Sequence, residues 1–188
     1  MGSVIFIDNG VDGFDVLFST NQIMAKIDEI GKLIKRDHSH RSQPPIIMMV
    51  LTGGLYFGVD LSRALDGLGL VHHVDTVGLK SYISDEQGGQ VKMISQPHAD
   101  LGGRDIIVVE DIIDRGDTMN HLHSYLLNLP NPPDSISYCA LLVKNNHGPL
   151  DFEINYQGFE IGPEWVIGYG MDSEQAFRGF SDIYVKSS

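Results

Sequence analysis

The sequence predicts an α/β fold in which helices flank a core of parallel β-strands. Three mainly apolar runs, at residues 46–51, 106–109 and 135–143, favour buried strands. The first two are each followed by a glycine-bearing turn and then by apolar residues at helical spacing. The chain has 188 residues, of which 42% are hydrophobic, and this suffices for one domain with a sizeable core.

The first predicted helix begins at Ser19. Ser19 and Gln22 have the spacing of a capping box, and isoleucines recur at helical spacing from Ile23 to Ile34. The strand at 46–51 then leads into a glycine turn and a second helical pattern at 55–65. A glycine turn before a helix is suited to binding an anion, although many α/β junctions carry such glycines.

A strand at 71–82 and a long loop follow. Residues 83–101 are polar, bear glycines and lack a regular apolar period. Loops of this length in a compact domain are usually functional.

The stretch from Asp105 to Thr118 is the most informative part of the chain. Glu110 and Asp111 end its apolar strand, and a loop that starts at Asp114 precedes a helical pattern. Ionised carboxylates accept hydrogen bonds from sugar hydroxyls or from hydrated Mg²⁺, and backbone N–H groups at a helix N-terminus favour phosphate. The stretch therefore indicates a sugar-phosphate site with a metal nearby; the alternative is an ordinary strand-to-helix junction with Asp114 as a helix cap.

This stretch resembles the 5-phosphoribosyl-1-pyrophosphate (PRPP) motif of the type I phosphoribosyltransferases, which is an apolar strand, Glu-Asp, two apolar residues and Asp-x-Gly-x-Thr. The resemblance implies a single domain over residues 1–188. Its parallel core spans about 19–150 and a small C-terminal hood spans about 151–188, to which the N-terminal segment can contribute.

The resemblance also implies how PRPP is held. Glu110 and Asp111 bind the ribose hydroxyls, and the 5-phosphate is gripped by Asp114, Arg115, Gly116, Asp117 and Thr118. The pyrophosphate is contacted by Thr52, Gly53, Gly54, Ser81, Tyr82 and Arg178. Many relatives carry Lys or Arg at the position of Thr52, and the preceding peptide, here Leu51–Thr52, is often cis. The loop at 83–101 corresponds to a mobile hairpin that closes over the site.

A second resemblance concerns the purine. Residues 158–172 are similar to the Gly-Phe-x-Ile-Pro and Gly-Tyr-x-x-Asp pattern of the hypoxanthine-guanine phosphoribosyltransferases. It implies that Lys144 donates to the 6-oxo group, that Trp165 stacks on the base, and that carbonyls at Val166 and near Asp172 accept from its edge. Asp114 is then the general base, and the Mg²⁺ cofactor is held by Glu110, Asp111 and Asp172.

The implied function is Mg²⁺-dependent transfer of a 5-phosphoribosyl group from PRPP to hypoxanthine or guanine, which gives IMP or GMP and pyrophosphate in purine salvage. Two alternatives remain open at this point. The same frame serves other bases such as xanthine, and some proteins with this motif only sense PRPP and regulate nucleic-acid functions.

The composition limits the kinds of binding partner and the cellular compartment that we expect for this protein. The formal net charge of −12 argues against a nucleic-acid or anionic-membrane surface. The lone cysteine, Cys139, precludes a disulfide within the chain. No apolar run approaches a membrane span and the start of the chain lacks a signal pattern, so we expect a cytoplasmic protein with small-molecule substrates. The resemblance implies a homodimer or homotetramer.

Overall fold

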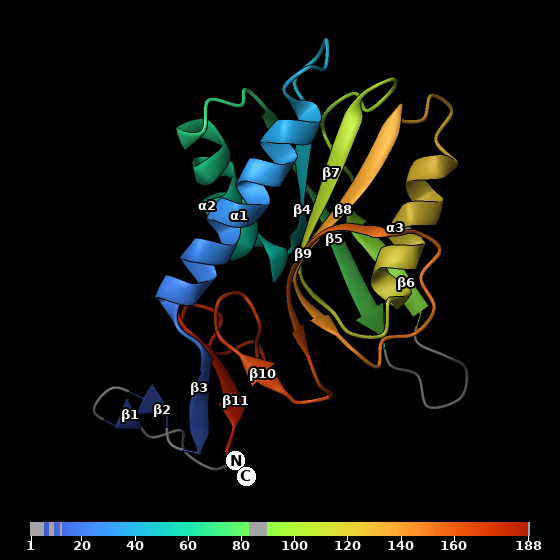
Figure 1. Cartoon of the computed structure of the whole chain (residues 1–188). Helices are drawn as coiled ribbons and strands as arrows, with labels where there is room; N and C mark the ends of the chain where they lie inside the picture. Colours follow the sequence, from blue (N-terminus) through green and yellow to red (C-terminus); the bar gives the residue numbers. More distant parts are fainter. Residues whose placement is uncertain (1–5, 8–9, 12, 83–89, 188) are drawn as a thin grey trace.

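A six-stranded sheet forms the centre of the protein, in the order β6-β5-β4-β7-β8-β9 (Figure 1). The computed structural model describes residues 6–7, 10–11, 13–82 and 90–187. Neighbouring strands from β5 to β9 are parallel, and β6 pairs antiparallel to β5 at the edge. The predicted parallel core is confirmed. The strands are β4 (Ile46–Leu51), β5 (His73–Tyr82), β6 (Gln90–Ser95), β7 (Asp105–Ile113), β8 (Ser135–Lys144) and β9 (Ile154–Ile161).

Helices cover both faces of this sheet. Helices α1 (Thr20–His38) and α2 (Gly54–Gly67) lie on one face and α3 (Asp117–Leu127) on the other (Figure 1). Alternate residues of β4 explain this arrangement, because Ile47 and Met49 pack in the core that includes α1 and α2, whereas Ile46 and Met48 pack in the core that includes α3. Among the described helices, none is both long and apolar enough to cross a membrane.

The N-terminus of α1 has the contact that the sequence predicted. The backbone N–H of Ser19 donates to Oε1 of Gln22 over 3.0 Å. This bond is one half of a capping box and fixes the start of the helix.

A second, smaller sheet joins the two ends of the chain. Its order is β1 (Phe6–Ile7), β2 (Gly10–Val11), β3 (Phe14–Phe18), β11 (Ile183–Lys186) and β10 (Val166–Ile167). It lies near the carboxyl ends of the central strands (Figure 1). The backbone N–H and the hydroxyl of Thr20 both donate to Asp182 Oδ1, at 2.6 and 2.7 Å, and so tie α1 to the segment before β11.

The position of β9 differs from the sequence expectation. Residues 154–161 fall within the hood expected from about 151, yet β9 pairs in parallel with β8, from Tyr138 opposite Ile154 to Lys144 opposite Ile161. The burial of β9 alternates, as expected at the edge of a sheet, so the strand lacks the continuous apolar run that marked the central strands. Below, "hood" denotes residues 162–187.

The sheet topology determines where loops meet. The chain passes from β4 to β5 on one side of β4, whereas β7 pairs on its other side. The loops that follow β4 and β7 therefore leave neighbouring carboxyl ends, at the switch point where open α/β sheets bind ligands.

Candidate active site

A cavity of about 630 Å³ lies at this switch point, between the loops after β4 and β7 and the hood. It gathers side chains that are far apart in the sequence. The residues predicted from sequence that line it are Thr52, Gly53, Glu110, Asp111, Asp114, Arg115, Gly116, Asp117, Thr118, Trp165, Asp172 and Arg178.

A smaller cavity of about 170 Å³ adjoins the first, and Lys144, Val166 and Met171 contribute to its wall. The two cavities share Asp114 and Trp165. The smaller one therefore opens where the loop after β7 begins, and we refer to it as the slot.

One ion pair lies in the wall of the slot. Lys144 Nζ donates to Asp114 Oδ2 over 3.1 Å, with side chains that are 9% and 54% exposed. Lys144 ends β8 and Asp114 directly follows β7, the neighbouring parallel strand, so the sheet itself brings the two groups together.

Glu110 and Asp111 form a buried acid pair at the end of β7, each 7% exposed. The N–H of Asp111 donates to Glu110 Oε1 over 3.1 Å, and the N–H of Ile112 donates to Asp111 Oδ1 over 2.9 Å. Burial raises the pKa of Glu110 well above its ordinary value, and the adjacent Asp111 raises it further. Burial also raises the pKa of Asp111, against the opposing effects of hydrogen bonds and of Arg178. A nearby cation would therefore favour full ionisation of the pair.

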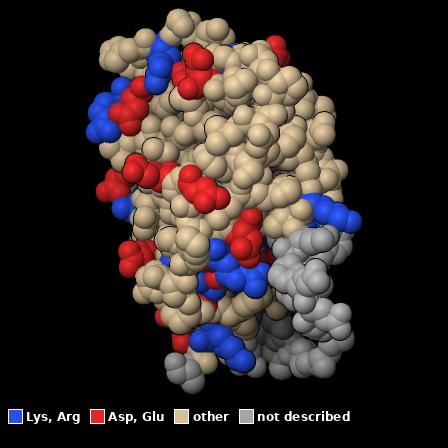
Figure 2. Space-filling model, turned by 90° about the vertical axis from the view of Figure 1, so that its right-hand side faces the viewer, with Lys and Arg blue, Asp and Glu red and all other residues tan. Residues whose placement is uncertain are grey.

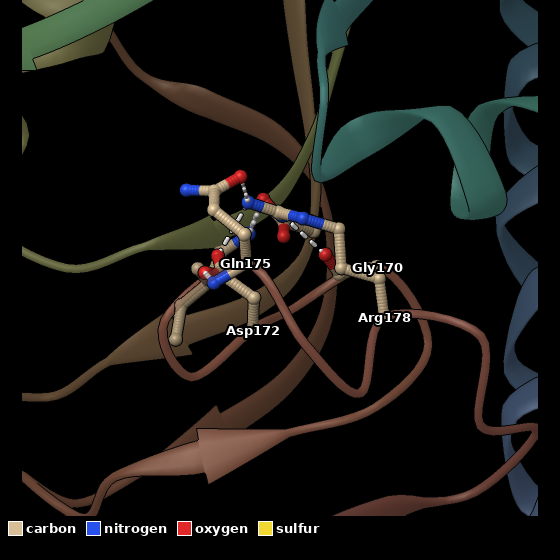
Figure 3. Close-up of polar contacts among 6 residues, drawn as sticks. Gly170, Asp172, Gln175 and Arg178 are labelled. Carbon is tan, nitrogen blue, oxygen red and sulfur yellow. Dashed lines mark hydrogen bonds and ion pairs between the residues drawn. The ribbon is translucent and has the colours of Figure 1, made fainter.

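The hood supplies an arginine and a carboxylate that bind each other (Figure 3). Arg178 Nη2 lies 2.5 Å from Asp172 Oδ1, and Arg178 Nη1 donates to the carbonyl of Gly170 over 2.6 Å. The N–H of Gln175 donates to Asp172 Oδ2 over 2.7 Å. Asp172 is therefore engaged within the hood. Within the described part of the chain, no three His, Cys, Asp or Glu side chains are arranged to hold a metal by themselves.

The loop after β4 lies directly on β7 because it contains glycines. A Cβ on Gly53 would lie 2.1 Å from Asp111 Oδ2, and one on Gly54 would lie 2.8 Å from the carbonyl oxygen of Val109. Only residues without a side chain allow this approach. The Leu51–Thr52 peptide is cis, as the family resemblance predicted. Gly54, the first residue of α2, is buried and does not line either cavity.

The loop after β7 turns at Gly116, which has a φ of +88° and caps α3. A Cβ at this glycine would lie 2.4 Å from Leu150 Cδ2. Helix α3 begins at the next residue, so the loop supplies the helix N-terminus expected of a phosphate site. Arg115 Nε lies 3.4 Å from Asp117 Oδ2, and both side chains are more than half exposed.

Two predicted contacts cannot be followed in the described part of the chain. Ser81 and Tyr82 end β5, but their side chains lie outside it, as do residues 83–89 of the expected closing hairpin. The described part of that hairpin, β6, pairs with β5. The role of these residues stays a prediction.

Sequence reasoning missed two polar residues of the larger cavity, Lys80 and Gln175. A signal was available for Lys80, because it directly precedes Ser81 near the carboxyl end of β5. Gln175 carries no such signal, since it lies in an irregular hood loop with a φ of +68°.

Comparison with known proteins assigns the family. Residues 19–174 match the phosphoribosyl transferase domain. The hypoxanthine-guanine phosphoribosyltransferase of Mycobacterium bovis is 33% identical over 173 residues, which cover 89% of this chain and 83% of that protein. The hypoxanthine phosphoribosyltransferase of Salmonella typhimurium is 32% identical over 165 residues, which cover 87% and 90%.

A solved structure agrees with these relatives. The hypoxanthine phosphoribosyltransferase from Trypanosoma cruzi, in complex with the product IMP, superposes with a TM-score of 0.86 at 28% identity, covering 95% of this chain and 97% of that one. The fold and the sequence motifs lead to the same conclusion, and this chain belongs to the phosphoribosyltransferase family of enzymes.

Proposed function

We propose that this enzyme transfers the 5-phosphoribosyl group from PRPP to a 6-oxopurine, hypoxanthine or guanine, and releases pyrophosphate. The observation that carries the proposal is the slot, in which Lys144 faces Asp114 beside the loop that begins α3. Relatives named for hypoxanthine, and the T. cruzi relative with IMP bound, support the same substrate class.

The larger cavity suits PRPP. Its phosphate end would lie against Gly116 and Thr118, where backbone N–H groups at the start of α3 favour an anion. Glu110 and Asp111 offer acceptors for the ribose hydroxyls. The loop from Thr52 to Gly54 would meet the pyrophosphate through its backbone, together with Arg178, which is the only one of these residues to bring a positive charge.

The slot suits a purine. Lys144 can donate to an oxygen at position 6 but cannot accept from an amino group, so adenine is disfavoured. Trp165, which is 60% exposed at the opening of the slot, offers a face for stacking. Carbonyls of Val166 and of the segment near Asp172 would accept from the opposite edge of the base.

Asp114 is proposed as the general base. It lies at the junction of the two cavities, where N9 of a purine would meet C1 of the ribose and N7 would lie beside the carboxylate. A carboxylate within reach can accept the proton that N7 loses, and proton transfer of this kind contributes about 10²–10⁴ in rate.

The acid pair can supply only some of the oxygen ligands that Mg²⁺ needs, and the substrate and water would supply the others. Mg²⁺ usually keeps several waters and binds through one or two carboxylates together with substrate phosphates. Glu110 and Asp111 are oxygen donors whose burial leaves their charge only partly compensated, so we propose that they hold Mg²⁺ that arrives with PRPP, with Asp172 as a further contact. When bound, the ion neutralises charge on the departing pyrophosphate.

The domain division and the assembly are also proposed. We assign the core to the central sheet with its three helices, and we propose that the hood and the N-terminal strands β1 to β3, which together form the second sheet, belong to the same domain. A homodimer or homotetramer is expected from the family, and light scattering on the purified protein would measure the assembly.

A base screen with PRPP and Mg²⁺ tests the proposal. Hypoxanthine, guanine, xanthine, adenine and uracil are offered separately, and the formation of nucleotide and pyrophosphate is measured. We expect turnover with hypoxanthine or guanine and little with adenine. Preference for xanthine would change the assigned base.

Absence of turnover with every base would favour a PRPP-sensing protein, for which a nucleic-acid binding assay is the direct check. On the face shown in Figure 2, Lys and Arg side chains are interspersed with Asp and Glu and form no continuous basic patch. This pattern and the net charge of −12 favour the enzyme over the nucleic-acid regulator.

A further inference from the structure

Tyr169 links the hood to the helix that follows the glycine loop. It lies in the turn between β10 and β11 and is 4% exposed. Its hydroxyl donates to Oδ2 of Asp60, on α2, over 2.7 Å. Its φ of +49° lies in the left-handed region, which residues with a side chain rarely adopt without compensating contacts. The turn is therefore held in one particular conformation at this position.

The next residue of the turn lies directly on the loop after β4. A Cβ on Gly170 would lie 2.2 Å from the carbonyl oxygen of Gly53. Gly53 in turn lies against the carboxylate of Asp111. The backbones of the hood turn and the glycine loop are thus in direct contact, and the loop in turn lies on the Asp111 carboxylate. The loop therefore has little freedom to shift without moving the turn.

The same turn also positions the charged groups of the hood (Figure 3). The carbonyl of Gly170 accepts from Arg178, which is bound to Asp172. The N–H of Gly170 donates to the carbonyl of Arg178 over 2.9 Å. Gly170 therefore contacts the glycine loop and also fixes the position of Arg178, which in turn binds Asp172.

Helix α2 makes Asp60 an effective point of attachment. The helix begins at Gly54 and has no side-chain cap at its N-terminus. Asp60 lies less than two turns further along, so a contact there restrains the rigid segment that carries the start of the helix. Asp60 also pairs with Arg63 over 3.2 Å, but Arg63 is on the same helix and is 76% exposed; that pair does not connect α2 to the hood.

We propose that Tyr169 and Asp60 are positioning residues for the pyrophosphate end of the substrate, an inference that rests on the proposed function. Their hydrogen bond fixes the distance between the loop from Thr52 to Gly54 and the hood groups Asp172 and Arg178. Neither residue lines the two cavities. Loss of the bond affects the grip on pyrophosphate, while Lys144 and Trp165 of the slot, which lie outside this turn, are left in place.

The chain provides a matched control for a purely structural effect. Tyr156 on β9 is also 4% exposed, and its hydroxyl donates to Oδ2 of Asp37, on α1, over 3.2 Å. This second tyrosine–aspartate bond joins a strand to a helix in the same hydrophobic core as Tyr169. Tyr156 lines neither cavity, so Tyr156→Phe removes a comparable bond away from the site.

The test compares Tyr169→Phe, Asp60→Ala, Asp60→Asn and Tyr156→Phe with the wild-type enzyme. The measurements are kcat, the KM values for PRPP and for hypoxanthine, the Kd of inorganic pyrophosphate with Mg²⁺ by calorimetry, and Tm. Tyr169→Phe and Asp60→Ala are expected to raise the PRPP KM and the pyrophosphate Kd about five- to tenfold and to change the hypoxanthine KM less than about twofold. Asp60→Asn keeps an acceptor oxygen and restores most of the affinity.

The control separates positioning from stability. Tyr156→Phe is expected to lower Tm to a similar extent and to leave the PRPP KM unchanged. An equal rise of the PRPP KM in Tyr156→Phe, a parallel rise of the hypoxanthine KM in Tyr169→Phe, or unchanged pyrophosphate affinity would overturn the inference. If Tyr169→Phe does not fold, the inference is tested by comparing the PRPP KM and the pyrophosphate Kd of Asp60→Ala with those of Asp60→Asn.

Failure of the inference can be distinguished from failure of the proposed function. A wild-type protein that turns over none of the bases overturns the proposed function whatever the variants do. An active wild-type enzyme whose Tyr169 and Asp60 variants bind pyrophosphate normally overturns the positioning role alone.

Discussion

Lys144 Nζ and Asp114 Oδ2 lie 3.1 Å apart and form an ion pair in the wall of the slot, although one residue is proposed to read the base and the other to accept its proton. The lysine side chain is 9% exposed, and a buried ammonium group is costly unless it has a partner such as this carboxylate. The two proposed functions are therefore electrostatically coupled. Substitution of either residue changes the environment of the other, and the following two predictions should be tested together.

Asp114→Asn is expected to lower kcat with hypoxanthine by about 10²–10⁴ and to leave the KM for PRPP nearly unchanged. The amide retains the size of the side chain but cannot accept a proton as a base. Steady-state kinetics measure both parameters, and Asp134→Asn, an exposed carboxylate outside both cavities, serves as the control. An unchanged rate in Asp114→Asn would remove this residue as the base.

Lys144→Gln is expected to relax discrimination against adenine, because a glutamine side chain can accept from an amino group as well as donate to an oxygen. The ratio of kcat/KM for hypoxanthine to that for adenine should fall about tenfold or more. Lys144 contacts Asp114, so the effects of the two substitutions should not be independent. The Asp114→Asn, Lys144→Gln double variant should therefore lose less kcat/KM for hypoxanthine than the product of the two single losses predicts. Retained discrimination would mean that another residue reads position 6.

The main features of the fold were predictable because they depend on local pattern. The strands β4 and β7 are buried on both faces, so their apolar runs are continuous and easy to recognise. The acid pair and Asp114 follow such a run directly. Once both strands are placed in a parallel sheet, their carboxyl ends meet, and the site residues on them come together without further information.

Other features depend on packing that no local pattern encodes. Strand β9 has a half-exposed edge pattern. Tyr169 and Asp60 are 109 residues apart, and each is unremarkable in its own segment. The ion pair between Asp172 and Arg178 depends on an irregular hood loop in which Glu174, Gln175 and Phe177 have positive φ. The sequence therefore indicated which groups reach the site, but not which contacts they make there.

Asp117→Asn keeps the backbone N–H through which this residue is expected to grip the 5-phosphate and removes the negative charge of its side chain. The KM for PRPP is expected to fall about two- to threefold, because that charge repels the substrate and competes for Arg115. The same charge favours the N-terminus of α3, so a small loss of Tm should accompany the gain in affinity. Both side chains are more than half exposed, and the effect on KM should shrink at high salt. A rise in KM would show that Asp117 helps to bind the substrate.

Glu110→Gln is expected to stabilise the metal-free protein and to impair its activity. Burial and the adjacent Asp111 raise the pKa of Glu110, which means that the folded state disfavours the ionised form of this carboxyl group. The neutral amide avoids this cost, and the free energy of unfolding should rise by about 1–2 kcal/mol. Urea denaturation at pH 7 with a chelator present measures this change. A destabilised variant would show that the carboxylate is already compensated within the fold.

Asp75→Asn is expected to destabilise the protein at neutral pH but not in acid. Asp75 is 7% exposed, and its carboxylate accepts hydrogen bonds from the N–H groups of Thr76, His98 and Ala99, each at 2.8 Å. These bonds attach the segment after β6 to β5. Burial alone would raise the pKa of Asp75, but the backbone hydrogen bonds outweigh it and lower the pKa below its ordinary value.

The sign of the pH effect follows from this lowered pKa. A carboxyl group that is more acidic in the folded state than in the unfolded state stabilises the fold above the unfolded pKa of about 3.9, and this contribution is lost as the pH falls through the folded pKa. The wild-type protein should exceed Asp75→Asn in free energy of unfolding by about 1–2 kcal/mol at pH 7, and the difference should shrink between about pH 4 and pH 2. Asp100→Asn, an exposed neighbour, should show no such trend. A difference that stays constant at every pH would mean that the hydrogen bonds to Asp75 do not depend on its charge.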